Sequence, residues 1–462
     1  MTRRLGAAAG AVIAALAAAQ PAAAHGIGTG VGESPLPPWL MYFGAATVLV
    51  VSFAALGVLW TRPVLALVAA GRPIGAAISR VLLSPVLATV LRVVSVAVLV
   101  GVWIAAAFGT NFPTQNFAPT FVYVVFWLGM PLLSVLFGNV WSVLNPWRAV
   151  FPHNEPLREY PSWLGYLPAA AGLFAFAALE LAYYDPADPR GLALAIAIYS
   201  AWTWTGAAVF GRDTWFRFGD AFSVYFRVLA AMAPFARRGD RIIVRAPISG
   251  LAAVERVPGL LGFIAVALGG VAFDGFSRSQ IWQRRVYDVQ SGFLPDHVGL
   301  AELATTLFNL GCLLLFVWGV ALVFLGALQV SQRMGHGDRR LSEAVLPSLV
   351  PIAFAYLIAH YFALFIYQGQ SAVPLASDPL GRGWDLFGTA SVKPNLTLLA
   401  TATIWYVQAV ALVVGHVCGL TVAHDRALAV LPRVRDALRS QYPILVLMVF
   451  YTVGGFWLLS RP

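Results

Sequence analysis

The sequence predicts an all-α protein, a polytopic transmembrane helix bundle of about ten spans. Hydrophobic residues make up 60% of the 462-residue chain and charged residues only 11%. Apolar runs long enough to cross a bilayer, which takes roughly 20 helical residues, follow one another almost from end to end. Because backbone polar groups find no water in hydrocarbon, such runs must form helices that pack together.

The first 24 residues are expected to be a cleavable signal peptide rather than part of the fold. Arg3 and Arg4 form a charged start, residues 5–19 are Ala-rich and apolar, and residues 22–24 form a small-residue cleavage site. Cleavage there would leave His25 as the mature amino terminus. Residues 25–462 are then expected to form one transmembrane helical domain.

Each predicted span is an apolar run between polar or charged loops. Trp39 and Trp60 bracket the first of them, at the positions that interfacial tryptophans occupy. The predicted spans are residues 39–60, 85–108, 119–138, 163–183, 191–210, 259–274, 299–329, 344–369, 396–423 and 441–459.

The distribution of basic residues predicts the orientation. With the mature amino terminus outside, the cytoplasmic loops carry 20 arginines, whereas the outer segments carry 7 lysines or arginines. This excess follows the positive-inside rule, so both termini are expected on the extracytoplasmic side of the cell membrane. The same loops account for the net charge of +10, so the expected partner is the lipid bilayer and not a nucleic acid. These cytoplasmic loops are residues 61–84, 139–162, 211–258, 330–343 and 424–440.

The cytoplasmic segment 211–258 contains an apolar stretch that is not expected to span the membrane. Within residues 213–235, charged side chains recur on one side of a helix and large apolar ones on another, which predicts an amphipathic helix lying on the inner leaflet. A re-entrant segment is the alternative. Residues 241–257 are expected to form a small hairpin around residues 247–250. The charged side chains of this helix are Asp213, Arg217, Asp220 and Arg227.

Two histidines lie inside predicted spans, where ionisable groups are costly and are functional candidates by default. His360 shares a helix face with Tyr356 and Tyr367, and His416 borders a GxxxG pair that lets a neighbouring helix approach closely. Either histidine could bind a metal or, less plausibly, heme, or could simply hydrogen-bond across a helix interface. A site shared by both is disfavoured, since their predicted depths differ by roughly 15 Å.

A second group of candidates lies at the predicted outer surface. Glu180, Asp274 and Glu302 fall at the outer ends of three spans, and Asp296 and His297 come just before one of these spans. Carboxylate and imidazole groups suit Zn²⁺, which can activate a bound water. His25 offers its amine and its imidazole to Cu(II), with His297 as a possible further ligand. The alternative is that all of these are solvated interfacial charges.

Several short motifs are shared with a known family. They are His25-Gly26-Ile27-Gly28, Leu36-Pro37-Pro38-Trp39-Leu40, Gly138-Asn139-Val140-Trp141, Asn145-Pro146-Trp147-Arg148, Phe273-Asp274-Gly275-Phe276-Ser277, His360-Tyr361, Gln368-Gly369-Gln370, Gly415-His416 and Ala423-His424-Asp425-Arg426. Together they resemble those of a family of bacterial, chiefly actinobacterial, integral membrane proteins labelled fenitrothion hydrolase. The resemblance covers nearly the whole mature chain and implies a membrane-embedded hydrolase of organophosphate triesters. Such a reaction needs an activated water and a stabilised phosphoryl oxygen; Asp274 with the outer histidine and acids could supply the first, and Arg278 or Arg284 the second.

Two non-enzymatic interpretations remain open beside the hydrolase. The chain could bind or transport a metal such as copper, heme or a small solute through His360 and His416. It could also be a structural subunit in which these histidines only hold helices together.

Overall fold

The computed structural model describes residues 36–293, 297–335 and 339–459. The predicted signal peptide, His25 and Asp296 lie outside these residues. The described chain is a helical bundle with one small sheet, which confirms the predicted all-α membrane fold. Among the described residues, eight helices are long and apolar enough to cross a membrane.

These eight helices coincide with eight of the ten predicted spans. The other two predicted spans, 163–183 and 441–459, also fall on helices, but neither is among the eight. One of these helices is only 15 residues long, and the other begins with a charged turn and contains Pro443. Eight spans are therefore supported by length and composition, and a total of ten stays a prediction.

Local sequence signals explain where several helices begin. Ser84 accepts a hydrogen bond from the amide of Leu87 and is followed by a proline, and Asp188 caps its helix in the same way. The elements of the first part of the chain are α2 (Pro38–Leu59), α3 (Leu65–Val68), β1 (Arg72–Pro73), α4 (Ala76–Leu82), α5 (Pro85–Phe108), η1 (Pro113–Gln115), α6 (Phe117–Thr120), the π-helix η2 (Phe121–Phe126), α7 (Gly129–Phe137), α8 (Trp141–Leu144), α9 (Pro146–Val150), α10 (Leu167–Leu181) and α11 (Pro189–Phe210).

The second part of the chain begins with the segment that was expected to lie on the membrane surface and continues with the longest helices. Its elements are α12 (Arg212–Phe218), α13 (Ala221–Ala230), β2 (Phe235–Arg238), β3 (Arg241–Val244), η3 (Ser249–Ala253), α14 (Leu260–Ser277), α15 (Gln280–Ser291), α16 (Val298–Met334), α17 (Arg339–Val345), η4 (Leu346–Ser348), α18 (Leu349–Gln368), η5 (Gly369–Ser371), α19 (Ala372–Ser377), α20 (Thr401–Val430) and α21 (Val434–Leu459).

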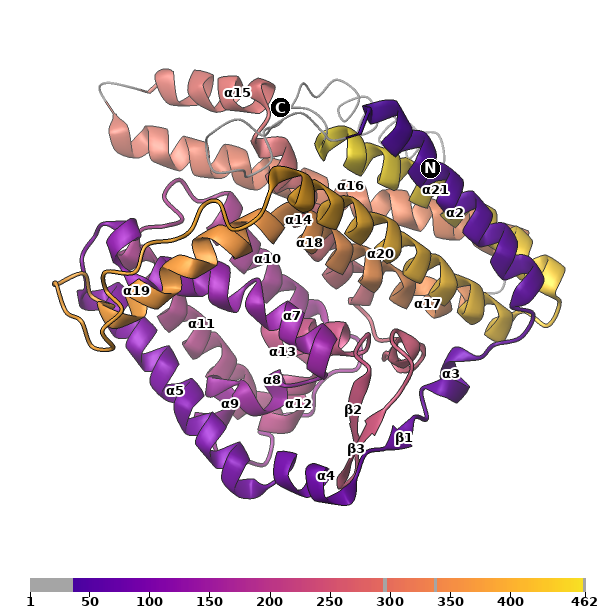
Figure 1. Cartoon of the computed structure of the whole chain (residues 1–462), viewed down its shortest axis with the longest axis horizontal. Helices are drawn as coiled ribbons and strands as arrows, with labels where there is room; N and C mark the ends of the chain where they lie inside the picture. Colours follow the sequence, from indigo (N-terminus) through magenta and orange to yellow (C-terminus); the bar gives the residue numbers. More distant parts are fainter. Residues whose placement is uncertain (1–35, 294–296, 336–338, 460–462) are drawn as a thin grey trace.

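Helices α2, α16, α18, α20 and α21 lie side by side in one group, and α14 connects this group to α10 (Figure 1). The closest packing is between α18 and α20, where the predicted GxxxG pair lies. A Cβ atom added to Gly415 would stand 2.2 Å from the Cβ of Ala355, and one added to Gly419 would stand 2.7 Å from the carbonyl oxygen of Ser348. The two glycines therefore allow the close approach that their spacing predicted.

The loops that were predicted to be cytoplasmic meet at one end of the bundle. Asp425, near the end of α20, accepts hydrogen bonds from the Trp60 indole and from the amides of Val64 and Leu65, and its other oxygen pairs with the buried Arg426. The antiparallel sheet, in the order β1-β3-β2, joins loop 61–84 to segment 211–258. The loops after α5, α10 and α19 contact one another at the other end, as the predicted alternation of the loops requires.

Segment 213–235 differs from the predicted amphipathic surface helix. It is broken at Gly219 and Asp220 into α12 and α13, and α13 is packed inside the protein against α7, α10 and α18. Asp220 is fully buried. Its carboxylate caps α13 and accepts a hydrogen bond from the Tyr199 hydroxyl, so Asp220, on the polar side of the predicted helix, contacts protein instead of water. The re-entrant alternative stays a prediction.

The predicted hairpin was placed too late in the chain. The hairpin consists of β2 and β3, with its turn at Gly239, whose φ of +61° suits glycine. The expected turn at 247–250 is instead the start of the 3₁₀ helix η3.

Candidate functional site

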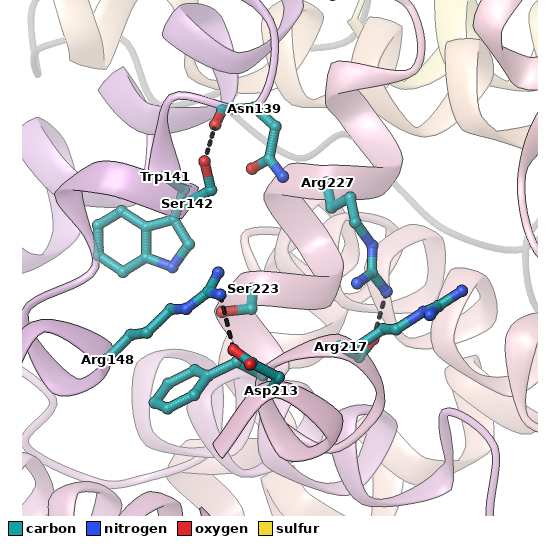
Figure 2. A pocket seen from close by; sticks show the side chains of 9 residues that line it. Asn139, Trp141, Ser142, Arg148, Asp213, Arg217, Ser223 and Arg227 are labelled. Atoms are coloured by element: carbon teal, nitrogen blue, oxygen red, sulfur yellow. Dashed lines mark hydrogen bonds and ion pairs between the residues drawn. The ribbon is translucent and has the colours of Figure 1, made fainter. Parts of the chain in front are cut away.

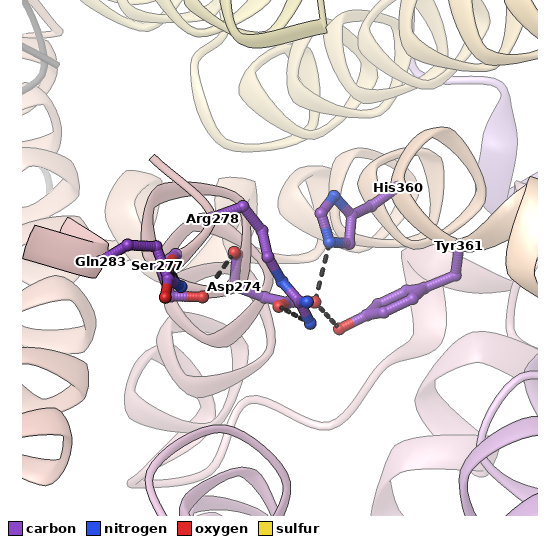
Figure 3. A network of polar contacts seen from close by, with 6 residues as sticks. All are labelled: Asp274, Ser277, Arg278, Gln283, His360 and Tyr361. Carbon is purple, nitrogen blue, oxygen red and sulfur yellow. Dashed lines mark hydrogen bonds and ion pairs between the residues drawn. The ribbon is translucent and has the colours of Figure 1, made fainter. Parts of the chain in front are cut away.

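The structure shows two polar clusters, one toward each end of the bundle. A cavity of about 320 Å³ opens among α8, α9, α12 and α13 and is lined by three arginines (Figure 2). None of the predicted site residues lines this cavity. The second cluster surrounds Asp274 and contains three of them (Figure 3).

Asp274 lies near the end of α14 and is only 2% exposed. Its Oδ2 atom accepts a hydrogen bond of 2.7 Å from the Tyr361 hydroxyl and lies 2.8 Å from Nε2 of His360. His360 and Tyr361 are consecutive residues of α18, and their rings stand edge to face with centroids 4.6 Å apart. One carboxylate oxygen is therefore held between two side chains of a neighbouring helix.

Small residues bring the supporting helices close to this carboxylate. A Cβ atom added to Gly269 of α14 would stand 2.7 Å from the Cα of Val317 in α16, so α14 and α16 touch through their backbones. Gly275 faces His360, whose Cε1 would lie 4.0 Å from an added Cβ atom. The carboxylate is thus placed by close packing of α14 against α16 and by ordinary van der Waals contact with α18.

Arg278 connects the buried carboxylate to the surface. It lies one helical turn after Asp274, its Nη2 is 3.4 Å from Oδ1 of Asp274, and its side chain is 40% exposed. Glu180 of α10 interacts electrostatically with Asp274 and Arg278. Asp274, Arg278, His360 and Tyr361 therefore form one network of hydrogen bonds and ion pairs between the end of α14 and α18.

This arrangement can perform acid–base chemistry. A carboxylate that accepts the Nε2–H of His360 fixes the tautomer and the orientation of the ring, which is the arrangement of histidine–carboxylate pairs in which the imidazole acts as a general base. The positive charge that then develops on the imidazole is stabilised by Asp274. Arg278 supplies a guanidinium whose five donors exceed what one long bond to Asp274 uses.

The structure brings together Asp274 and Arg278, which were predicted as catalytic, and His360, which was predicted to bind a cofactor. Arg284 lies apart from them, exposed on α15. His416 is also separate: its Nδ1 lies 2.8 Å from the carbonyl oxygen of Leu412 and its ring packs against Tyr356. Within the described residues, Nε2 of His416 is buried and has no hydrogen-bond partner.

The predicted metal ligands are only half described. His297 is exposed just before α16, and Glu302 lies in the first turns of that helix, whereas His25 and Asp296 lie outside the described ranges. Within those ranges, no group of three or more His, Cys, Asp or Glu side chains is arranged to hold a metal ion. The proposed outer metal site therefore stays a prediction.

Sequence reasoning missed Tyr361 as a site residue. The face analysis followed His360 at steps of three and four residues, and Tyr361 lies roughly 100° away from that face. Both side chains nevertheless reach Oδ2 of Asp274. The signal that was present is the pairing of a histidine with a hydroxyl-bearing aromatic residue inside an apolar span.

Comparisons of the chain with protein-family models, curated proteins and solved structures find no match.

Proposed function

We propose that this protein is a membrane-embedded hydrolase of hydrophobic organophosphate triesters, with its acid–base centre at Asp274, His360 and Arg278. The observation that carries the proposal is the 2.8 Å contact between the buried Asp274 carboxylate and Nε2 of His360. The substrate class comes from the resemblance to the fenitrothion hydrolase family. The native substrate is left open.

The proposed reaction is attack of water on the phosphorus of the triester. His360 removes a proton from the water as the new P–O bond forms. The bond between phosphorus and the aryl oxygen breaks, the aryl oxide leaves with the electron pair, and the proton held by His360 is finally given to it. Arg278 stabilises the charge that develops on the phosphoryl oxygen or sulfur. The products are a phenol and a dialkyl phosphate or thiophosphate.

The exposed guanidinium of Arg278 marks the route by which a substrate would reach the buried carboxylate. An apolar triester dissolves in the bilayer and can approach the end of α14 from the lipid. From the arginine distribution, we place this end of the bundle on the extracytoplasmic face of the cell membrane, with both chain termini on the same face.

A second candidate function is the binding or transport of a metal such as copper, heme or a small solute. The Nε2 atom of His416 favours this function, because it is buried and has no hydrogen-bond partner among the described residues. Such an imidazole nitrogen is a ligand for a metal ion or for heme iron. Metal analysis and a visible absorption spectrum of the purified protein distinguish the two functions. Bound metal or heme that is lost in His416→Gln, while organophosphate turnover is absent, would favour this candidate.

The hydrolase is tested by the release of nitrophenol from fenitrothion or paraoxon by the purified full-length protein. We expect Asp274→Asn and His360→Gln each to lower the rate by about 100-fold or more, as loss of a general base does. Arg278→Gln is expected to lower it as well, whereas Arg285→Gln, an arginine exposed on α15 and paired with Asp288, is the matched control.

Folding must be separated from chemistry in this experiment. Tyr361→Phe keeps the ring and removes one hydrogen bond to Asp274, so the helix packing is preserved and the pH profile of the rate should shift. Turnover in Asp274→Asn or His360→Gln within a fewfold of the wild type, or no turnover by folded wild-type protein, would overturn the proposal. If chelation abolishes the wild-type rate, the metal set His25, Asp296, His297 and Glu302 belongs in the mechanism.

A further inference from the structure

The cavity among α8, α9, α12 and α13 is lined by more arginines than carboxylates. Three of its nine lining residues are arginines, Arg148, Arg217 and Arg227, whereas Asp213 is its one carboxylate. Figure 2 shows Arg148 directed toward Asp213 and Arg227 directed toward the backbone of Arg217, whereas the guanidinium of Arg217 points away from the other labelled side chains, where it pairs with Glu255. The neutral polar lining residues are Asn139, Ser142 and Ser223.

The positive charges of this cavity exceed the negative ones. Arg148 pairs with Asp213 at 2.9 Å, and Arg217 pairs with Glu255. The hydrogen bonds of Arg227 that the described residues provide go to neutral oxygens, the Tyr166 hydroxyl and the Arg217 carbonyl group. One arginine of the lining is therefore not neutralised by a carboxylate.

A fourth arginine behind the cavity adds to this excess. Arg212 donates a hydrogen bond of 2.8 Å to the carbonyl oxygen of Arg148. Partial burial and the positive charge of Arg148 lower the pKa of Arg212. A further guanidinium therefore lies beside Arg148, held against its backbone.

The arginines are held in place before any ligand binds. Asn145 caps α9 through the amide of Arg148 and donates a hydrogen bond of 3.0 Å to the Ser223 hydroxyl, which ties α9 to α13. The guanidinium of Arg227 lies over the ring of Tyr166. Ordering these side chains in advance lowers the entropy cost of binding.

We propose that this cavity binds a phosphate group, carried either by a small soluble phosphate ester or by the headgroup of an anionic lipid. Guanidinium groups bind phosphate through paired, charge-assisted hydrogen bonds, and the serine and asparagine side chains can complete the shell. A volume of about 320 Å³ holds one phosphate with a small substituent. The site lies at the opposite end of the bundle from Asp274 and does not depend on the proposed hydrolase.

The test uses the full-length protein in detergent and two ligand arms. In the first arm, inorganic phosphate and glycerol phosphate are titrated by calorimetry. In the second, the thermal unfolding temperature is compared in micelles containing phosphatidylcholine alone or phosphatidylcholine with phosphatidic acid. Binding of inorganic phosphate or glycerol phosphate in the first arm assigns a soluble ligand. Stabilisation by phosphatidic acid without binding in the first arm assigns a lipid headgroup, and either result supports the site.

Three variants make the test specific. Arg227→Gln is expected to weaken binding by about tenfold or more, since it removes a charged donor. Asp213→Asn is expected to tighten binding several-fold, because it removes a negative charge from the cavity. Arg238→Gln, which changes the same charge on the exposed strand β2, should leave binding unchanged.

The opposite sign of the Asp213→Asn effect separates ligand binding from a structural role of the arginines. No response to either ligand, equal weakening in Arg238→Gln and Arg227→Gln, or weaker binding in Asp213→Asn would overturn the proposal. Organophosphate turnover is expected to be the same in Arg227→Gln as in the wild type, so failure of this site and failure of the hydrolase can be distinguished.

Discussion

The hydrogen bonds around Asp425 predict a large stability loss when this side chain is removed. Its Oδ1 atom accepts the Trp60 indole N–H at 3.2 Å and the Leu65 amide at 2.9 Å, as well as the amide of Val64. Its Oδ2 atom pairs with Arg426, and both side chains are buried. Asp425→Ala would leave three donors and one positive charge without their partner.

The magnitude follows from the burial of these groups. A buried donor without a partner costs about 1–3 kcal/mol, and breaking a buried ion pair costs about 3–5 kcal/mol. The groups share one carboxylate and can partly rearrange, so the terms do not add. We expect Asp425→Ala to lower the free energy of unfolding by about 3–5 kcal/mol. Asp425→Asn keeps an acceptor at Oδ1 but also breaks the ion pair with Arg426, so it is expected to lower the free energy of unfolding by a similar amount, about 3–5 kcal/mol.

The assay is reversible unfolding in mixed micelles by increasing sodium dodecyl sulfate, followed by tryptophan fluorescence. Asp288→Ala is the matched control, because it removes an aspartate that pairs with an arginine in an exposed position on α15. This variant should change the unfolding free energy by less than about 1 kcal/mol. An Asp425→Ala effect as small as that of the control would refute the reasoning.

Two further predictions concern helix packing and alkaline pH. Gly415→Ala should lower the unfolding free energy by about 1–3 kcal/mol, because the added methyl overlaps Ala355; in the same unfolding assay Gly454→Ala, with open space around its α-carbon, should cause no loss. Burial raises the pKa of Tyr160 to about 12. Because the unfolded chain ionises this group near pH 10, the stability it contributes is complete below pH 10 and is lost as the pH rises toward 12. Tyr160→Phe should therefore weaken the decline of the melting temperature between pH 10 and 12, and an unchanged decline would contradict this assignment.

Hydropathy predicted the spans well because the bilayer imposes length and apolar composition on every crossing helix. The eight apolar helices coincide with predicted ranges. The arginine-rich loops lie at one end of the bundle, as expected when successive spans cross the membrane in alternating directions. The close packing of α18 on α20 was also predictable, since Gly415 and Gly419 carry no side chain to keep the helices apart.

Partners across the bundle could not be predicted in this way. Asp274 and His360 are 86 positions apart, and their contact depends on the rotation of α14 and α18 about their own axes. Periodicity also distinguishes a polar from an apolar side of a segment, but it does not show whether protein, water or lipid contacts each side. At the start of α13 the polar side contacts protein: Asp220 accepts hydrogen bonds from the Tyr199 hydroxyl and the Ser223 amide.

The binding of the α3 amino terminus by Asp425 has a consequence for biosynthesis. The amide of Leu65 has no partner until Asp425 is synthesised, 360 residues later in the chain. Translation of this stretch takes roughly 20 to 70 s at ordinary rates. During that interval, loop 61–84 stands at the membrane surface without its final contacts. A nascent chain that stops before α20 is complete therefore presents an unpaired segment near its beginning, far from the point of truncation, to proteases that survey membrane proteins.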